Sequence, residues 1–176
     1  MKQLLLICAV MALVGCGGSK EKVTPETQAK AEPKKPEAVP VVTVTIDNPI
    51  LEKAIREQLK KPTGELTQAD LKKVTELELD RKQLTSVKGL EKLTQLKELD
   101  LDDNQLTDVK GLEELTQLTD LDLQENQLTD VTGLEKLTQL EQLYLQDNPN
   151  LTKAQIAELQ KALPKCFILS NPMVGR

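Results

Sequence analysis

The chain has 176 residues, with 23 Lys and Arg side chains against 28 Asp and Glu, and a formal net charge of −5 at pH 7. This length allows one modest domain with appendages, and the acidic balance argues against nucleic-acid binding, which needs a basic stripe or patch. The sequence contains no histidine. Because histidine is the commonest general base and metal ligand, its absence argues against an enzyme.

Residues 1–15 are typical of a secretion signal. Lys2 gives a basic start, and the apolar run that follows is too short to span a bilayer but suits a signal-peptide core. It ends in Leu-Val-Gly-Cys at positions 13–16, which resembles the lipobox of bacterial lipoproteins. The resemblance implies that Cys16 carries lipid and begins the mature chain. The alternative is a plain secretion signal with an incidental cysteine.

This resemblance also predicts a location. We expect a protein anchored by lipid to the bacterial cell envelope, without a preference for either side of the membrane. Enteric lipoproteins are retained in the inner membrane by an Asp after the lipidated cysteine, and this chain has Gly17 there. The outer membrane is therefore favoured over the inner one.

Residues 16–42 are expected to form a disordered tether. Four prolines stand among Lys, Glu, Thr and Ala, and hardly a large apolar residue precedes Val39. A segment of this composition cannot bury enough apolar surface to offset the entropy lost on ordering. Residues 1–42 contain six basic and four acidic residues, so the remainder of the chain carries a net charge of −7.

Residues 43–73 are expected to be an N-terminal helical cap. Asn48 and Pro49 precede apolar residues at helical spacing, which predicts a short amphipathic helix with proline in its first turn. Thr67 and Asp70 have the spacing of a capping box, which would open a second helical turn.

Residues 74–151 contain four copies of a 22-residue pattern. When Val74, Leu96, Leu118 and Leu140 are taken as position 1, leucines at positions 4 and 6 straddle one outward residue, which predicts short strands. Apolar residues at positions 14, 17 and 20 suit a tight 3₁₀ turn on the opposite side. The pattern LxxLxLxxNxL with this period indicates a leucine-rich repeat. We predict an α/β solenoid of four repeats, with a parallel concave sheet, a convex side of turns and capped ends.

Position 9 of the last three repeats is an asparagine, namely Asn104, Asn126 and Asn148. A side-chain amide both donates and accepts hydrogen bonds, so these residues are expected to serve buried backbone groups as a structural ladder. The first repeat has Lys82 there, and the ladder should therefore begin in the second repeat.

Residues 152–176 are expected to be a C-terminal cap and tail. Thr152 and Gln155 have capping-box spacing and should open a helix that ends before Pro164. The following Cys-Phe-Ile-Leu predicts a last short strand, in which Cys166 would be a small buried hydrophobe. If Cys8 leaves with the signal and Cys16 carries lipid, no internal disulfide can form.

Residues 47–172 resemble bacterial leucine-rich repeat proteins of the internalin-like, 22-residue class. The resemblance implies a non-enzymatic domain that binds another protein through the concave sheet, with no cofactor. Known binders of this class expose several aromatic residues there. This chain departs from that pattern, since Tyr144 is expected to be the one aromatic residue on the face.

The expected concave face is acidic. Positions 2, 3, 5, 7 and 8 of the repeats hold twelve acids and two bases, and neighbouring strands would align the acids in columns. One interpretation is a solvated surface that keeps the sheet soluble, as in a spacer protein without a dedicated partner. Another is a site for a basic protein, and a third is divalent-cation binding, although no EF-hand spacing occurs. We predict a monomer that binds protein and not nucleic acid, through Glu76, Glu78, Asp80, Glu98, Asp100, Asp102, Asp120, Asp122 and Tyr144.

Overall fold

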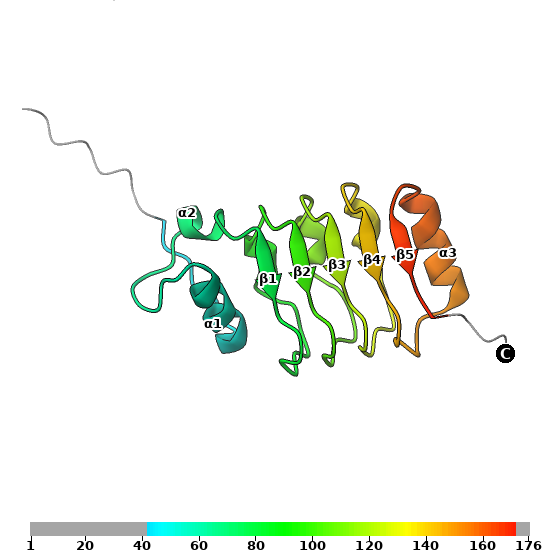
Figure 1. Cartoon of the computed structure of the whole chain (residues 1–176), viewed down its shortest axis with the longest axis horizontal. Coiled ribbons are helices and arrows are strands. Elements are labelled where there is room, and N and C mark those ends of the chain that lie inside the picture. Colours follow the sequence, from blue (N-terminus) through cyan, green and yellow to red (C-terminus); the bar gives the residue numbers. More distant parts are fainter. Residues whose placement is uncertain (1–41, 172–176) are drawn as a thin grey trace, which may run out of the picture. The chain divides into compact units, whose positions relative to one another are not determined.

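The computed structural model describes residues 42–171 (Figure 1). The chain divides into two units, Met1–Glu37 and Ala38–Arg176, and all described residues belong to the second. The expected signal, the lipobox with Cys16 and the tether up to residue 41 lie outside the described residues, as does the tail beyond Asn171.

The described residues form a five-stranded parallel sheet in chain order (Figure 1). The strands are β1 (Glu76–Glu78), β2 (Glu98–Asp100), β3 (Asp120–Asp122), β4 (Gln142–Tyr144) and β5 (Phe167–Leu169). Each of the first four comes from one repeat, and their central leucines are in register with one another and with Ile168 of β5. The predicted α/β solenoid with a parallel sheet is confirmed.

The opposite side of the solenoid consists of short 3₁₀ helices, as the spacing of three predicted. They are η1 (Leu90–Lys92), η2 (Leu112–Glu114) and η3 (Leu134–Lys136). A glycine precedes each helix, with φ of 107°, 103° and 107° at Gly89, Gly111 and Gly133. This left-handed backbone is costly for a residue with a Cβ, which explains the repeated glycine.

The core is a stack of leucine and valine side chains between the sheet and the 3₁₀ helices. In the first three repeats the apolar residues at positions 1, 4, 6, 11, 14, 17 and 20 are all no more than 5% exposed. Leu121 is fully buried, and its neighbours in register are Leu99 and Leu143. Stacking of repeats therefore buries what one repeat could not bury alone.

Helices close both ends of the array, as expected. Helix α1 (Pro49–Gln58) begins at Asn48, whose Oδ1 accepts a hydrogen bond from the backbone N–H of Ile50 at 2.9 Å. It buries Leu51 and Ile55 against the first repeat. A single helical turn, α2 (Gln68–Leu71), follows with the reciprocal capping box of Thr67 and Asp70.

The C-terminal cap consists of helix α3 (Lys153–Ala162) and strand β5. Thr152 and Gln155 form a second reciprocal capping box, and Leu159 faces the core. Cys166 is a free cysteine that is 4% exposed. Strand β5 pairs with β4, so the cap extends the concave sheet by one strand beyond the four repeats.

Candidate binding surface on the concave sheet

The register of the sheet places acidic side chains from three repeats next to one another. Glu76 aligns with Glu98 and then Asp120, and Glu78 aligns with Asp100 and then Asp122. Adjacent strands in such a sheet lie about 4.8 Å apart, so each acid has a like charge as its neighbour. We call these six residues the acidic columns: Glu76, Glu98 and Asp120 in one, and Glu78, Asp100 and Asp122 in the other.

The acidic columns have no basic partner within the described part of the chain. Seven ion pairs occur between residues 42 and 171, and none of them includes a column carboxylate. On the concave side, Arg81 lies 3.5 Å from Asp103, beyond the ends of the strands. Within residues 42–171, no Lys or Arg side chain is therefore ion-paired with a column carboxylate.

A shallow hollow of about 240 Å³ follows the columns across the sheet. Tyr144 lies at its C-terminal side, and the tyrosine hydroxyl donates a hydrogen bond to Gln142 Oε1 at 2.6 Å. Of the nine predicted concave residues, seven line this hollow, whereas Asp80 and Asp102 do not. The hollow is lined by Glu76, Leu77, Glu78, Glu98, Leu99, Asp100, Asp120, Leu121, Asp122 and Tyr144.

Asp80 and Asp102 occupy the next row, two residues beyond the ends of β1 and β2. Both are half-buried. The pKa of Asp102 is raised above its ordinary value, first because the carboxyl is partly buried and then because Asp122, Glu125 and Asp100 place negative charge nearby. At this residue the like charge on the face thus adds to the effect of burial on the pKa.

Sequence analysis missed two apolar side chains on the concave face. The register pairs Gln142 with Phe167 and Tyr144 with Leu169, while Leu143 pairs with Ile168, which packs on the core. Phe167 is 60% exposed and Leu169 is 36% exposed. The expectation that Tyr144 is the one aromatic residue on this face is therefore wrong.

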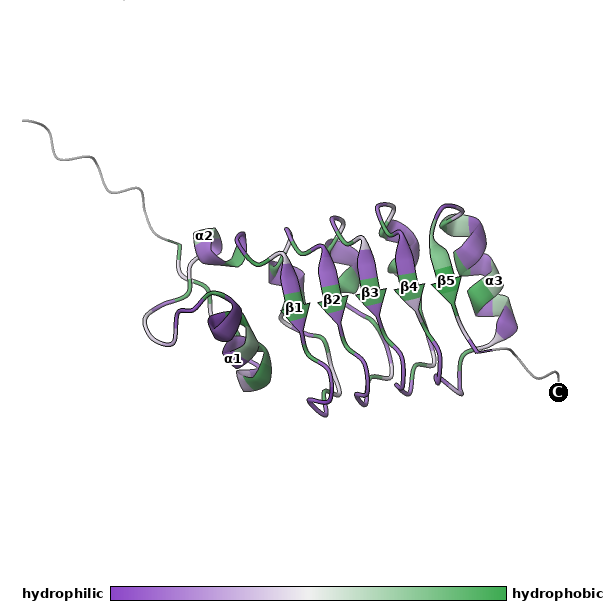
Figure 2. Ribbon diagram, in the orientation of Figure 1, coloured by the Kyte–Doolittle hydropathy of each residue, from purple (hydrophilic) through white to green (hydrophobic). Residues whose placement is uncertain are grey.

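The hydropathy of the strands makes the same contrast visible. In β1 to β4 an apolar centre is flanked by hydrophilic residues, whereas β5 is apolar along its length (Figure 2). We call Tyr144, Phe167 and Leu169 the apolar edge. The sequence contains a pattern that indicates the apolar edge. Alternation within Phe-Ile-Leu places Phe167 and Leu169 on one face of the strand once the middle residue is buried.

The three asparagines point away from this surface and into the solenoid. Asn104 Oδ1 accepts hydrogen bonds from the backbone N–H groups of Lys82 and Leu84, and its Nδ2 donates to the carbonyls of Leu79 and Leu101. Asn126 and Asn148 repeat the links between neighbouring repeats. All three are at most 6% exposed.

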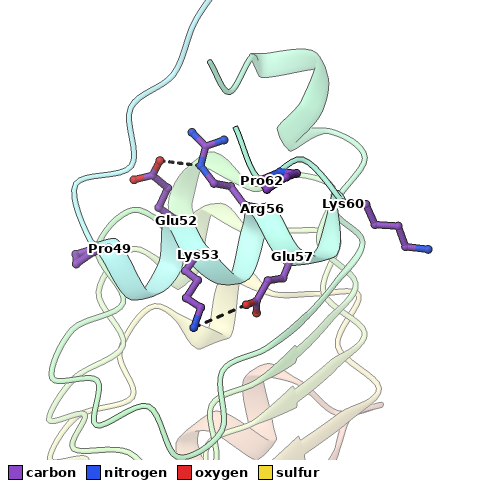
Figure 3. A pocket seen from close by; sticks show the side chains of 7 residues that line it. All are labelled: Pro49, Glu52, Lys53, Arg56, Glu57, Lys60 and Pro62. Atoms are coloured by element: carbon purple, nitrogen blue, oxygen red, sulfur yellow. Dashed lines mark hydrogen bonds and ion pairs between the residues drawn. The ribbon is translucent and has the colours of Figure 1, made fainter. Parts of the chain in front are cut away.

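A second hollow, of about 510 Å³, lies along the outer face of α1 (Figure 3). Four of its five charged side chains form two ion pairs, since Arg56 Nε lies 2.9 Å from Glu52 Oε1 and Lys53 Nζ lies 3.8 Å from Glu57 Oε1. Unlike the concave sheet, this face therefore offers little unbalanced charge. Its remaining lining residues are Pro49, Lys60 and Pro62.

No cluster of three or more His, Cys, Asp or Glu side chains within the described residues could hold a metal ion. No helix within residues 42–171 has the length and apolar character needed to cross a membrane.

The fold and this surface define a short, capped leucine-rich repeat solenoid with an open concave face. Residues 55–171 match the family model described as "Leucine-rich repeat and WD repeat-containing protein 1, LRR". This match covers more than half of the chain, and the chain belongs to the leucine-rich repeat family. No match was found among curated proteins.

Solved structures agree with this assignment. An internalin (inlF) from Listeria monocytogenes is 32% identical with a TM-score of 0.60, over 68% of this chain and 35% of that one. An internalin C2 (inlC2) from the same organism is 27% identical with a TM-score of 0.65, over 75% of this chain and 59% of that one. The chain thus spans less than two thirds of either structure and is internalin-like in its repeat domain.

Proposed function

We propose that this chain is a non-catalytic protein-interaction module that binds a basic protein surface through its concave sheet. The observation that carries the proposal is the pair of acidic columns, six carboxylates in register with no basic partner in residues 42–171. Burial of the leucines does not require acids at the outward positions. Each like-charged neighbour costs about 0.8 kcal/mol in water before screening by salt.

A basic partner would convert this cost into attraction. Electrostatic complementarity between a negative face and a positive one accelerates encounter and selects among partners. The internalin-like resemblance supports the same face, because proteins of that class use the concave sheet for binding. The raised pKa of Asp102 is consistent with a face whose charge is unbalanced in the free domain.

We propose further that the module is a bacterial lipoprotein, anchored to the envelope through Cys16 and carried on the tether of residues 16–42. The support is the apolar segment ending in Leu-Val-Gly-Cys, and the outer membrane is the favoured location. Substitution Cys16→Ser should move the protein from the membrane fraction to the soluble fraction. A variant that stays in the membrane fraction without lipid would refute the anchor.

The binding proposal is tested by cross-linking in cells followed by capture of the tethered protein. The test variant carries Glu76→Lys, Glu98→Lys and Asp120→Lys. These three residues form the acidic column whose side chains make no hydrogen bond within residues 42–171. The control carries Glu65→Lys, Glu114→Lys and Glu158→Lys, which are exposed acids outside the concave face and change the net charge equally.

A protein captured by the wild type and by the control, but lost in the test variant, would support the proposed site. Without the cross-linker, capture from a lysate should also weaken as salt concentration rises. The same proteins captured by all three forms would refute it. The acidic face would then be a solvated surface, and the chain would be a spacer without a partner on that face.

A further inference from the structure

The apolar edge lies on the open concave side of the sheet at its C-terminal end. Apolar side chains that gather on one exposed face mark interaction sites, whereas single scattered ones need no explanation. Only four large hydrophobic residues between positions 42 and 171 are exposed, and Phe167 and Leu169 are two of them. Both lie on the concave side of one three-residue strand, where Leu169 pairs with Tyr144 and Phe167 pairs with Gln142 of β4.

The acidic columns and the apolar edge form one continuous surface. Tyr144 lines the acidic hollow together with Asp122 and is also the register neighbour of Leu169. Across the sheet, the face is therefore acidic over β1 to β3, carries Gln142 and Tyr144 on β4, and is apolar on β5. Sequence-distant residues assemble this order, since β5 follows α3 and not a repeat.

The charge of the surface selects one kind of occupant. A second copy of the chain would bring a second acidic face against the columns, which costs free energy by like-charge repulsion. Anionic lipid is disfavoured for the same reason. Basic side chains are attracted to the columns, and an apolar side chain beside them would be anchored by burial against Phe167 and Leu169.

We propose, on the basis of the proposed function, that the concave face recognises a linear segment with an apolar anchor at one end and lysines or arginines after it. The anchor lies over β4 and β5, and the basic residues lie over β3, β2 and β1. Strands are about 4.8 Å apart and an extended chain advances about 3.3 Å per residue. The basic residues would therefore lie within about two to six residues of the anchor.

The test uses the full chain and fluorescent peptides in binding titrations at low and at physiological salt. The first peptide has Phe and Leu at one end and three lysines spaced over the next six positions. The second replaces Phe and Leu by Ser, and the third replaces the lysines by Ser. Each peptide is also made in reverse order, because the proposal allows the segment to cross the sheet in either N-to-C direction.

The wild type should bind the complete peptide, in one of its two orders, at least about tenfold more tightly than either incomplete one, since burial of one large apolar side chain is worth about 1.5–3 kcal/mol. The variant with Phe167→Ser and Leu169→Ser should lose this advantage and retain the affinity of the wild type for the lysine-only peptide. The Lys variant of Glu76, Glu98 and Asp120 should lose binding of both basic peptides. Ile50→Ser, which removes an exposed apolar side chain on α1, should behave as the wild type.

Three results would overturn the inference. If the Phe167 and Leu169 variant keeps the preference for the complete peptide, the apolar edge is not the anchor site, while the acidic face can still be the binding site. If no peptide binds the wild type at low salt, linear recognition is wrong, whatever the cross-linking experiment gives. If sedimentation shows a wild-type dimer that the Phe167 and Leu169 variant lacks, the edge binds a second copy instead.

Discussion

At the scale of single residues, Asp102 shows how the concave face concentrates like charge. Its pKa is raised by partial burial and by the charges of Asp122, Glu125 and Asp100. An acid whose pKa is higher in the folded than in the unfolded protein disfavours folding when it is ionised, and this penalty disappears as the pH falls and the carboxyl is protonated.

Substitution Asp102→Asn should therefore stabilise the domain at pH 7. We expect a gain of roughly 0.5 kcal/mol in the free energy of unfolding, kept small because the carboxylate is partly solvated and screened. Urea denaturation of both proteins at pH 7 and at pH 3 would measure it. The gain should vanish at pH 3, and a destabilised variant at pH 7 would contradict the assigned environment.

The pKa of Asp70 is shifted in the opposite direction from that of Asp102. Lys61 Nζ lies 2.8 Å from its carboxylate and the hydroxyl of Thr67 donates to it, so the pKa of Asp70 is well below its usual value. A lowered pKa in the folded protein stabilises the fold at neutral pH, and this contribution is lost as the pH falls through 3.8 toward the lowered value.

Substitution Asp70→Asn should consequently lower the free energy of unfolding at pH 7 and matter progressively less in acid. The measurement is the difference in midpoint of thermal unfolding between the two proteins, followed from pH 7 down to pH 2. A difference that stays constant over this range would mean that the carboxylate charge is not what stabilises the first cap.

At the scale of the element, each of the first three repeats depends on one turn before its 3₁₀ helix. Gly111 has φ of 103°, and its backbone N–H donates to Glu113 Oε2 at 2.5 Å. Gly89 with Glu91 and Gly133 with Glu135 repeat this hydrogen bond. The turn is therefore held by a glycine that allows the conformation and by a glutamate that satisfies its amide.

Substitution Gly111→Ala should cost about 1–2 kcal/mol in the free energy of unfolding, because the left-handed conformation is unfavourable for a residue with a Cβ. Space is not the cause, since an added Cβ would lie 3.7 Å from Glu91 Oε2, an ordinary contact. Urea denaturation would measure the cost. The neighbouring exposed Lys110→Ala should change stability by less than about 0.5 kcal/mol.

The period of the sequence predicted the elements well because one 22-residue pattern dictates strand, turn and core at once. The capping boxes at Thr67 and Thr152 were also predictable, since they depend on local spacing. The face of Phe167 was not predicted, because alternation within Phe-Ile-Leu gives the face only when Ile168 is known to be buried, and that depends on the pairing of β5 with β4. The left-handed backbone at position 8 was not predicted either. Arg81, Asp103 and Glu125 have φ of 56°, 50° and 47° there, and Arg and Glu have no local preference for this conformation.

At the scale of the whole domain, the sheet makes distant parts of the array depend on one another. Strands β1 and β5 are linked through three others by continuous pairing, and one core cluster includes both Leu77 and Cys166. Burial raises the pKa of the Cys166 thiol to about 11. Native Cys166 should therefore react slowly with alkylating reagents, because the thiolate is the reactive form, and fast reaction would require unfolding.

This gives a test of whether the array unfolds as a unit. Substitution Leu77→Ala in β1, four strands from Cys166, should destabilise the domain by about 2–4 kcal/mol. In a cooperative array the alkylation rate of Cys166 would rise by the same free energy, roughly 30-fold to 1000-fold. Iodoacetamide labelling at pH 8, followed by mass spectrometry of the peptide containing Cys166, separates this thiol from Cys8 and Cys16.

If Leu77→Ala lowers the overall stability and leaves the alkylation rate of Cys166 unchanged, the C-terminal cap unfolds independently of the first repeat. The coupled result would mean that the acidic columns and the apolar edge fold and unfold together as parts of one cooperative unit.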